Sequence, residues 1–416
     1  MHKFLHLADV HLDSGILCRS EALRTKLNLE LQAGFKRSID FAIKEKVVAV
    51  FIAGDLFDAD NLSIGTELFI HEQFQRLNEA HIPVIYTAGQ SDPADEVGAV
   101  SDRPWPKNVI FINDASPKVI ELQDVDGKPI ARVVGAGYTT RKIEENLVLR
   151  FPQAKEQIPY IGLLHTRVHS AFGVTQEQSG TNACEVKHLK APGYIYWALG
   201  GVHQHQRLAG IPNAWYPGNF SGRSADEAGF KGALLLSLKE DEEVSVEFKP
   251  FSSVQWFDLS LANLEDIDDV ESLFRAAEHA FEDQRGEDGD INVQLTRLTL
   301  SGMCPIVDEL KSETRRALIE EKLAYHLNVD DVEIRIEHLT ALVDVNVYRN
   351  EPHLLSEVLK VIDDVSENTS LLDELTPQVL VRKVSDDRKT EYLKSLVTGF
   401  DREAIVRLTR EDSHAH

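Results

Sequence analysis

FLHLADVH, residues 4–11, decides the fold, because an apolar run of strand length ends there in an aspartate and a histidine. Side chains two residues apart on an extended segment project to the same side, so Asp9 and His11 can reach one ion. A carboxylate and an imidazole are ligands that divalent transition metals accept. The triplet alone is a weak signal, and the rest of the chain decides its weight.

Strands and helices alternate over the next eighty residues. Apolar runs at 47–52 and 82–86 predict two buried strands. A four-residue apolar spacing predicts amphipathic helices over 20–45 and about 64–80. Strand-helix-strand units of this kind predict an α/β layered fold, in which the functional loops lie at the carboxyl ends of the strands.

From about residue 109 the pattern changes to closely spaced strands with turn residues between them. The expected strands are 109–112, 118–122, 131–137, 160–164, 194–199, 232–238 and 243–248. His165 directly follows the fourth of these strands, and His203 follows the fifth within one turn. The later strands therefore also end in residues that bind metals.

Five candidate ligands stand at predicted strand ends: Asp9, His11, Asp55, His165 and His203. Singly, each has a structural explanation, because an aspartate after a glycine commonly caps a turn and a lone histidine is usually structural. Together, five oxygen and nitrogen ligands at one sheet edge suit Mn²⁺, Fe²⁺ or Zn²⁺, and Asp55 can bridge two ions. The sequence therefore predicts a metal site that activates water and holds a phosphoryl oxygen.

Length and charge restrict the function. A chain of 416 residues predicts one large catalytic-type domain and one or two smaller domains. The 44 basic and 68 acidic residues give a net charge of −24, whereas a protein that grips DNA by neutralising phosphates carries a basic face. The charge argues against autonomous, tight DNA binding. The charge does not exclude a cleft with bound metal ions that acts on phosphodiesters, or a basic partner protein that binds the DNA.

The cysteines and the apolar segments indicate the compartment. Cys18, Cys184 and Cys304 are scattered and form no C-x-x-C pair, which suits a reducing environment. The first residues lack the regions of a signal peptide, and no stretch reaches the apolar length of a membrane span. We therefore expect a cytoplasmic protein.

The last third of the chain predicts smaller units after a boundary near 250–265. The pattern there predicts a small α+β unit with a helix at 266–284, a strand at 291–300, a helix at 306–326 and a strand at 332–345. Residues 352–416 predict charged amphipathic helices, and their best apolar positions are Leu393, Leu396, Phe400 and Ile405. The acidic stretch over 256–290 predicts a solvated helix and loop.

Five short motifs give the chain a family resemblance: DVH (9–11), GDLFD (54–58), GQSDP (89–93), LHT (164–166) and GGVH (200–203). In this series the chain resembles the calcineurin-like metallophosphoesterases, and within them the bacterial SbcD- and YhaO-type DNA exonuclease subunits. YWALG (196–200) and YPGN (216–219) are similar to that branch. The resemblance implies a four-layer α/β sandwich over residues 1–255, with two mixed sheets flanked by helices. It further implies a smaller α+β capping domain over 256–350 and helices over 351–416 that bind a partner.

The resemblance also implies roles for the motif residues, with Mn²⁺ as the expected ion. The first metal would take Asp9, His11, Asp55 and His203, and the second would take Asp55 and His165. The family's third motif is G-N-H-D, whose asparagine binds the second metal and whose histidine assists the leaving group. Gln90 and Ser91 stand at these positions, so Gln90 is a candidate ligand, Ser91 a weak catalytic candidate and Asp92 a support behind the ligands. Gly201 replaces the first histidine of the G-H-x-H motif, and His205 is a candidate substitute.

Two functions follow from this resemblance. The first is a metal-dependent DNA phosphodiesterase of reduced activity, an exonuclease-type subunit in DNA repair that works with an SMC-like coiled-coil ATPase and forms a homodimer. The second is a catalytically dead subunit that assembles with this ATPase and regulates it. A small-molecule phosphatase fits the acidic surface but not the match around Trp197 and Tyr216. Loss of both the leaving-group histidine and a metal ligand predicts slow chemistry.

Overall fold

The computed structural model describes residues 1–15, 20–100, 103–124, 126–155, 158–169, 182–211, 213–239, 243–286, 291–349, 354–367, 397 and 399–411. The chain divides into two compact units, one of residues 1–256 with 288–294 and the other of residues 257–287 with 295–416. Three residues named in the sequence analysis lie outside the described residues: Cys18, Leu393 and Leu396.

The first sheet of the larger unit has the strand order β14-β13-β1-β2-β3-β4. Its strands are β1 (His2–Leu7), β2 (Ala49–Ala53), β3 (Val84–Thr87), β4 (Val109–Ile112), β13 (Gly232–Leu238) and β14 (Val244–Pro250). β1 to β4 run parallel, whereas β13 and β14 pair antiparallel. The carboxyl ends of β1 and β2 therefore meet at one edge, where Asp9 and Asp55 follow them.

The second sheet has the order β11-β12-β10-β7-β6-β5. Its strands are β5 (Lys118–Gln123), β6 (Pro129–Ala136), β7 (Tyr160–His165), β10 (Tyr196–Gly200), β11 (Gln206–Arg207) and β12 (Ala214–Tyr216). β6, β7, β10 and β12 are parallel, and the two edge strands are antiparallel. Gly200 pairs with His165 in this register, so the loops that carry His165 and His203 leave the same edge.

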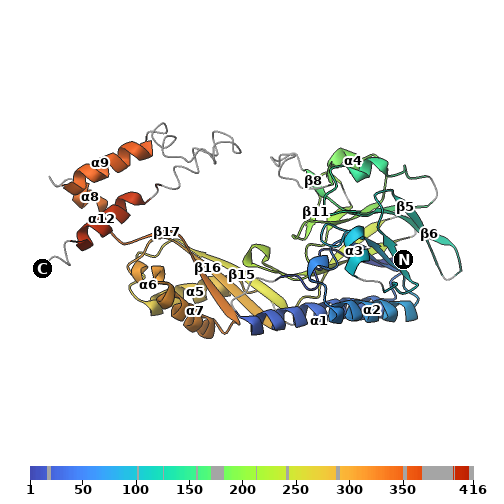
Figure 1. The fold of residues 1–416 in the computed structure, drawn as a ribbon, viewed down its shortest axis with the longest axis horizontal. Coiled ribbons are helices and arrows are strands. Elements are labelled where there is room, and N and C mark those ends of the chain that lie inside the picture. Colours follow the sequence, from blue (N-terminus) through green and yellow to red (C-terminus); the bar gives the residue numbers. More distant parts are fainter. Residues whose placement is uncertain are drawn as a thin grey trace. The chain divides into compact units, whose positions relative to one another are not determined.

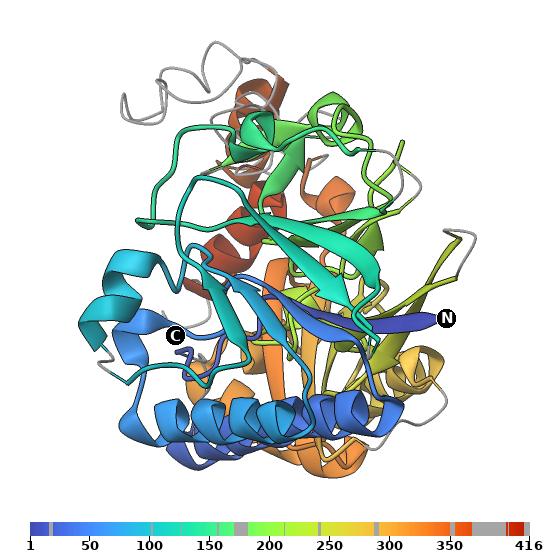
Figure 2. The same cartoon turned by 90° about the vertical axis from the view of Figure 1, so that its right-hand side faces the viewer.

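The two sheets form the inner layers of a four-layer sandwich. Alternation along β1 places Leu5 and Leu7 in the core beneath helices α1 (Glu21–Glu45) and α2 (Ile64–Glu79), while Phe4 lies in the core between the sheets. Figure 2 shows α1 and α2, in blue, along one side of the sheets. A third core, around Trp197, covers the outer face of the second sheet with α4 (Val186–Lys190) and η2 (Leu147–Arg150). The predicted architecture of two mixed sheets flanked by helices is confirmed.

Short elements complete the larger unit. They are α3 (Ala94–Val100), η1 (Ala59–Asn61), η3 (Ala225–Glu227) and the parallel pair β8 (Arg167–His169) and β9 (Ala183–Glu185). The predicted helices at 20–45 and 64–80 are confirmed as α1 and α2, and each begins where a serine, Ser20 or Ser63, caps it with its hydroxyl. The helix α3 follows directly after the third motif, and no pattern in the sequence predicted it.

The smaller unit packs helices on a three-stranded sheet of order β15-β16-β17 (Figure 1). Its elements are β15 (Val254–Leu261), α5 (Val270–Gln284), β16 (Val293–Met303), α6 (Val307–Lys311), α7 (Glu313–Leu327) and β17 (Asp331–Thr340). The helix predicted over 306–326 is wrong as one element, because Ser312 has an extended ψ of 112° and separates α6 from α7. The strand predicted to reach Val345 is wrong at its end, because β17 stops at Thr340.

Three helices described near the C-terminus are α8 (Val345–Arg349), α9 (Leu354–Glu367) and α12 (Phe400–Glu411). Val345, Leu359 and Ile405 form a small buried cluster that joins them, so Ile405 takes the apolar role predicted for it. Phe400, the other described apolar candidate, is exposed. None of the described helices has the length and apolarity that a membrane span requires.

Candidate metal centre

The loops after β1 and β2 are held together by their backbones. The amide of Asp9 donates to the carbonyl of Gly54 at 3.2 Å, and the amide of His11 donates to the carbonyl of Asp55 at 3.0 Å. Asp9, His11 and Asp55 all adopt positive φ angles, between 50° and 53°. Residues other than glycine rarely adopt this conformation, and such strain concentrates at functional sites.

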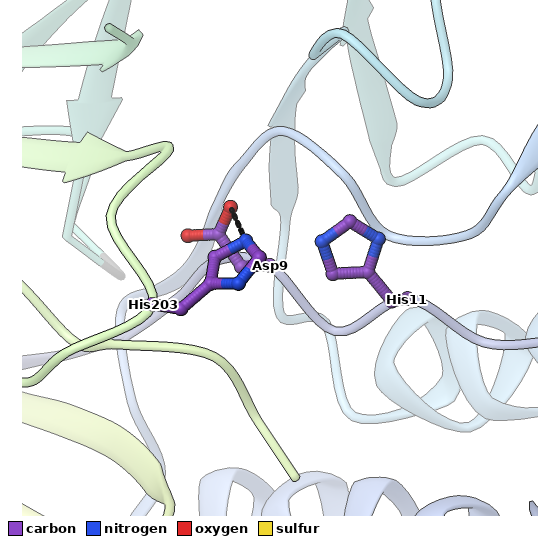
Figure 3. A group of neighbouring side chains, drawn as sticks. All are labelled: Asp9, His11 and His203. Carbon is purple, nitrogen blue, oxygen red and sulfur yellow. Dashed lines mark ion pairs between the residues drawn. The ribbon is translucent and has the colours of Figure 1, made fainter. Parts of the chain in front are cut away.

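Side chains from four strand ends converge in two overlapping groups. Asp9, His11 and His203 form one group, and Asp9, Asp55 and His165 form the other, with ligand atoms inside each group within 4.8 Å of one another. Figure 3 shows the first group, in which the ring of His203 lies next to Asp9, with its Nε2 3.8 Å from Asp9 Oδ1, and the ring of His11 has its centroid 5.3 Å from that of His203. The structure thus brings together all five residues that stood out at strand ends. The prediction of a single sheet edge is wrong, because β1 and β2 belong to the first sheet and β7 and β10 to the second.

Asp55 belongs to the second group and also lies close to the first, whereas Asp9 is common to both. Its Oδ2 is 3.7 Å from the Nε2 of His11 and 3.7 Å from the Nε2 of His165. Asp9, His11, Asp55 and His165 are each at most 5% exposed. A carboxylate in this position could share two neighbouring ions.

Each of the three histidines uses Nδ1 for a hydrogen bond and turns Nε2 toward the carboxylates. The Nδ1 partners are Asp58 for His11 at 2.7 Å, the carbonyl of Ala53 for His165 at 3.0 Å, and Glu227 for His203 at 2.6 Å. Bonds of this kind fix the ring and the tautomer of histidines that bind metals through the other nitrogen.

The charges in the site favour a bound cation. Burial alone would lower the pKa of His11 and of His165, but the neighbouring carboxylates outweigh it and raise both. Burial would raise the pKa of Asp55, yet the two histidines and the bonds from Ser91 lower it. The buried Nε2 of His11 has no hydrogen-bond partner among the described residues. Buried carboxylates with an unpartnered imidazole nitrogen fit a divalent cation, because burying such groups without compensation is costly.

Comparison with known proteins agrees with this geometry. The sequence model of one family, described as calcineurin-like phosphoesterase, matches residues 2–205. A protein of Bacillus subtilis, described as the uncharacterized metallophosphoesterase YhaO, is 31% identical over 353 residues, which cover 82% of this chain and 84% of that protein. The chain belongs to the calcineurin-like phosphoesterase family.

Relatives of this phosphoesterase also occur among DNA repair proteins. The DNA double-strand break repair protein Mre11 of Sulfolobus acidocaldarius is 21% identical over 415 residues, which cover 96% of this chain and 99% of that protein. The Mre11 of Sulfurisphaera tokodaii is 31% identical over 255 residues, covering 58% of this chain and 60% of that protein. Calcineurin-like phosphoesterases are dimetal enzymes, and this chain has two candidate groups of ligands.

Asp92 fastens the loops of the phosphoesterase site from behind. Its fully buried carboxylate accepts hydrogen bonds from the backbone amides of Asp55 at 3.0 Å, Leu56 at 2.6 Å and Gly89 at 2.6 Å, and from the hydroxyl of Tyr86. Burial and the charge of Asp55 raise the pKa of Asp92 to about 6, against the opposing effect of these donors. Asp92 therefore joins the loops after β2 and β3.

Ser91 and Gln90 differ in their contact with the site: Ser91 bonds to a candidate ligand, whereas Gln90 is exposed. Ser91 donates twice to Asp55, from its amide to Oδ1 at 2.8 Å and from its hydroxyl to Oδ2 at 3.0 Å. Because the hydroxyl of Ser91 donates to Asp55, Ser91 helps to hold the side chain of this candidate metal ligand in place. The catalytic candidate from the sequence thus has a positioning contact.

Gly201 contributes its backbone where the resemblance implied a histidine. Its amide donates to Asp9 Oδ1 at 3.1 Å and Oδ2 at 3.0 Å, and its φ is +100°. A Cβ at this residue would lie 3.1 Å from the Nε2 of His165, beside the second group. His205 belongs to neither group of ligands, and its ring stacks against Trp215 with the centroids 5.7 Å apart.

Two residues contact His203 that the sequence did not predict, Glu227 and Arg223. Glu227 accepts from His203, from the Nδ2 of Asn219 at 2.6 Å and from the amide of Arg223 at 2.9 Å. Burial would raise the pKa of Glu227, but the bonds from His203 and Arg223 lower it well below its usual range. Neither Glu227 nor Arg223 belongs to a strand-end pattern. Only the nearby YPGN motif, which contains Asn219, marked this region in the sequence.

Proposed function

We propose that this phosphoesterase hydrolyses DNA phosphodiester bonds with Mn²⁺, as an exonuclease-type subunit of reduced activity in DNA repair. The observation that carries the proposal is the position of Asp55, whose Oδ2 is 3.7 Å from a histidine nitrogen in each direction. Similarity to an Mre11 over nearly the whole chain supports DNA as the substrate. The cysteine usage suits the cytoplasm.

The residues present supply binding and orientation. Asp9, Asp55 and the three histidines would hold the ions, which lower the pKa of water and stabilise charge on the phosphoryl oxygens. Asp58 and Glu227 hold two of the histidine rings in place. Ser91 stands where the family has its leaving-group histidine, and its hydroxyl does not replace that histidine, because a serine hydroxyl is a poor acid near neutral pH. General acid assistance is typically worth about 10²–10⁴ in rate, so we expect turnover reduced on that scale.

Most of the affinity for DNA would come from a partner protein. A net charge of −24 opposes unaided DNA binding, so we propose that an SMC-like coiled-coil ATPase brings the DNA. Exposed apolar side chains on the C-terminal helices support a docking role: Leu354 and Val361 on α9, and Phe400 on α12. A homodimer is part of the same proposal.

A second candidate is a catalytically dead subunit that regulates the ATPase. It is favoured by the engagement of Ser91 with Asp55 and by the bare backbone at Gly201. The retention of five converging ligand residues favours the enzyme.

Hydrolysis of bis(p-nitrophenyl) phosphate and of end-labelled DNA with Mn²⁺ separates the two candidates. The variants are Asp55→Ala and the double revertant Gln90→Asn/Ser91→His. Gly201→His is tested separately, because the φ of +100° at this residue strains any side chain. Wild-type turnover that Asp55→Ala abolishes supports the enzyme. Turnover that appears only in the revertant supports the dead subunit.

A further inference from the structure

The second group of ligands lacks a donor beside His165. Gly201 occupies the place of a histidine and offers no side chain, although a Cβ there would lie 3.1 Å from His165 Nε2. Two carboxylates, Asp9 and Asp55, remain in this group with one imidazole. The positive charge available to a phosphate on this side is therefore reduced if an ion binds weakly here.

An arginine is fixed beside this position. The Nε of Arg167 donates to the carbonyl of Gly201 at 3.1 Å, while the amide of the same glycine donates to Asp9. Arg167 begins β8, two residues after His165, and the amide of Thr166 between them bonds to the carbonyl of Gly200 at 2.9 Å. Backbone contacts thus hold the guanidinium next to the second group.

Among the described residues, none neutralises the charge of Arg167. Over the described part of the chain no carboxylate pairs with Arg167, its only hydrogen bond is the one to Gly201, and its side chain is exposed. Arg223, beside the first group, differs, because its Nη2 lies 3.3 Å from Glu227 Oε1 and 3.0 Å from His203 Nδ1. In a chain of net charge −24, an anchored and unpaired arginine at a phosphoesterase site is a specific feature.

We propose that Arg167 binds a non-bridging oxygen of the substrate phosphate on the side of the second group, where Gly201 has removed a ligand. The inference rests on the proposed function and names the residue that recognises the phosphate. The bond at Nε leaves the two Nη groups to donate to a phosphate, in the forked arrangement that suits arginine. An arginine placed in this way stabilises charge on the phosphoryl group as it develops.

The test measures binding of inorganic phosphate by calorimetry in the presence of Mn²⁺, alongside its inhibition of phosphodiester hydrolysis. The variants are Arg167→Ala, Arg167→Lys and the control Arg132→Ala. Arg132 pairs with Glu121 at 3.0 Å and lies beside Tyr160, at the end of β7 opposite His165. Mn²⁺ stoichiometry and the melting temperature are measured for every variant.

We expect Arg167→Ala to weaken phosphate binding about 10- to 100-fold, since a hydrogen bond to a charged group is lost, and to raise KM more than it lowers kcat. Arg167→Lys should recover part of the affinity, and Arg132→Ala should bind phosphate as the wild type does. Mn²⁺ stoichiometry should not change in any variant. Equal phosphate affinity in Arg167→Ala and Arg132→Ala overturns the inference, as does wild-type protein that binds no phosphate. Phosphate binding by a wild type that cleaves no DNA leaves the Arg167 result standing and overturns the nuclease function alone.

Discussion

Ser91 donates to both carboxylate oxygens of Asp55, with its amide 2.8 Å from Oδ1 and its hydroxyl 3.0 Å from Oδ2. The carboxylate of the second group that also lies close to His11 is therefore oriented by a residue in the loop after β3. Because both donors favour the charged form, they also help to lower the pKa of Asp55 against the effect of burial. These two contacts give Ser91 a role in orienting a candidate metal ligand.

Ser91→Ala should weaken Mn²⁺ binding modestly. The substitution removes the hydroxyl bond and leaves the amide bond, and one hydrogen bond of this kind is worth about 1 kcal/mol, so we expect roughly a five-fold loss of affinity. The pH dependence of kcat should keep its shape, since no proton donor is lost. Isothermal titration with Mn²⁺ and a pH–rate profile check both points. A hundred-fold fall in kcat at unchanged Mn²⁺ affinity would show that Ser91 acts on the leaving group.

Glu227→Gln should weaken Mn²⁺ binding at the first group of ligands. Glu227 holds the Nδ1 of His203 at 2.6 Å, and loss of such a partner typically costs about 10- to 100-fold in metal affinity. Asp226→Asn, at the exposed neighbouring acid, is the matched control and should bind Mn²⁺ as the wild type does. Equal affinities for the two variants would contradict an orienting role for Glu227.

Asp92→Ala should be strongly destabilising. Four buried donors would lose their acceptor, and unsatisfied buried groups cost about 1–3 kcal/mol each, so we expect a loss of unfolding free energy of at least about 3 kcal/mol. Tyr86→Phe removes a single donor and should cost about 1 kcal/mol. Urea denaturation of the metal-free proteins measures both. Similar losses for the two variants would show that the backbone amides find other partners.

The strand ends were predictable from the sequence because buried parallel strands are continuous apolar runs, and their carboxyl ends share one edge. On that basis alone Asp9 could be placed near Asp55, and His165 near His203, because each pair follows neighbouring parallel strands. That the two pairs lie on different sheets, which meet at the site, could not be predicted from the strands themselves. The positive φ angles at Asp9 and Asp55 left no mark in the sequence, since aspartate is common in ordinary turns.

Contacts made across the fold could not be predicted in the same way. Glu227 reaches His203 from the 3₁₀ helix η3, and Arg167 reaches Gly201 across two loops, so no local spacing connects either pair. The break at Ser312 was also hidden, because residues 311–316 read KSETRR and contain neither glycine nor proline to mark it. Tertiary structure decides these details, whereas local periodicity decides the elements.

His6 should make the protein sensitive to mild acid. Burial between the sheets lowers its pKa from 6.5 to about 3, and its Nδ1 lies 3.0 Å from the hydroxyl of Tyr196. Below pH 6.5, His6 therefore binds a proton in the unfolded chain but stays neutral in the folded chain, so the free energy of unfolding falls as the pH falls toward 3. Between pH 7 and pH 5 this amounts to about 2 kcal/mol.

Urea denaturation of metal-free protein at the two pH values tests this, because His6→Gln should lose about 2 kcal/mol less than the wild type over the interval. His279→Gln, at a histidine whose side chain is 81% exposed, is the control and should keep the wild-type dependence. An unchanged pH dependence in His6→Gln would assign the acid sensitivity to other groups.

Single substitutions should separate the two groups of ligands. His203→Gln affects only the group of Asp9, His11 and His203, whereas His165→Gln affects only the group that contains Asp55. Each variant should bind one Mn²⁺ fewer than the wild type, or bind it at least about 10-fold more weakly. Asp9 belongs to both groups, so Asp9→Asn should weaken Mn²⁺ binding at both. Mn²⁺ should then no longer raise the melting temperature of this variant as it does that of the wild type. Calorimetry and thermal melts after treatment with a chelator measure these quantities. If His165→Gln bound Mn²⁺ with wild-type stoichiometry and affinity, the second group would not be a metal site, and the charge that Arg167 supplies would be the main positive charge on that side.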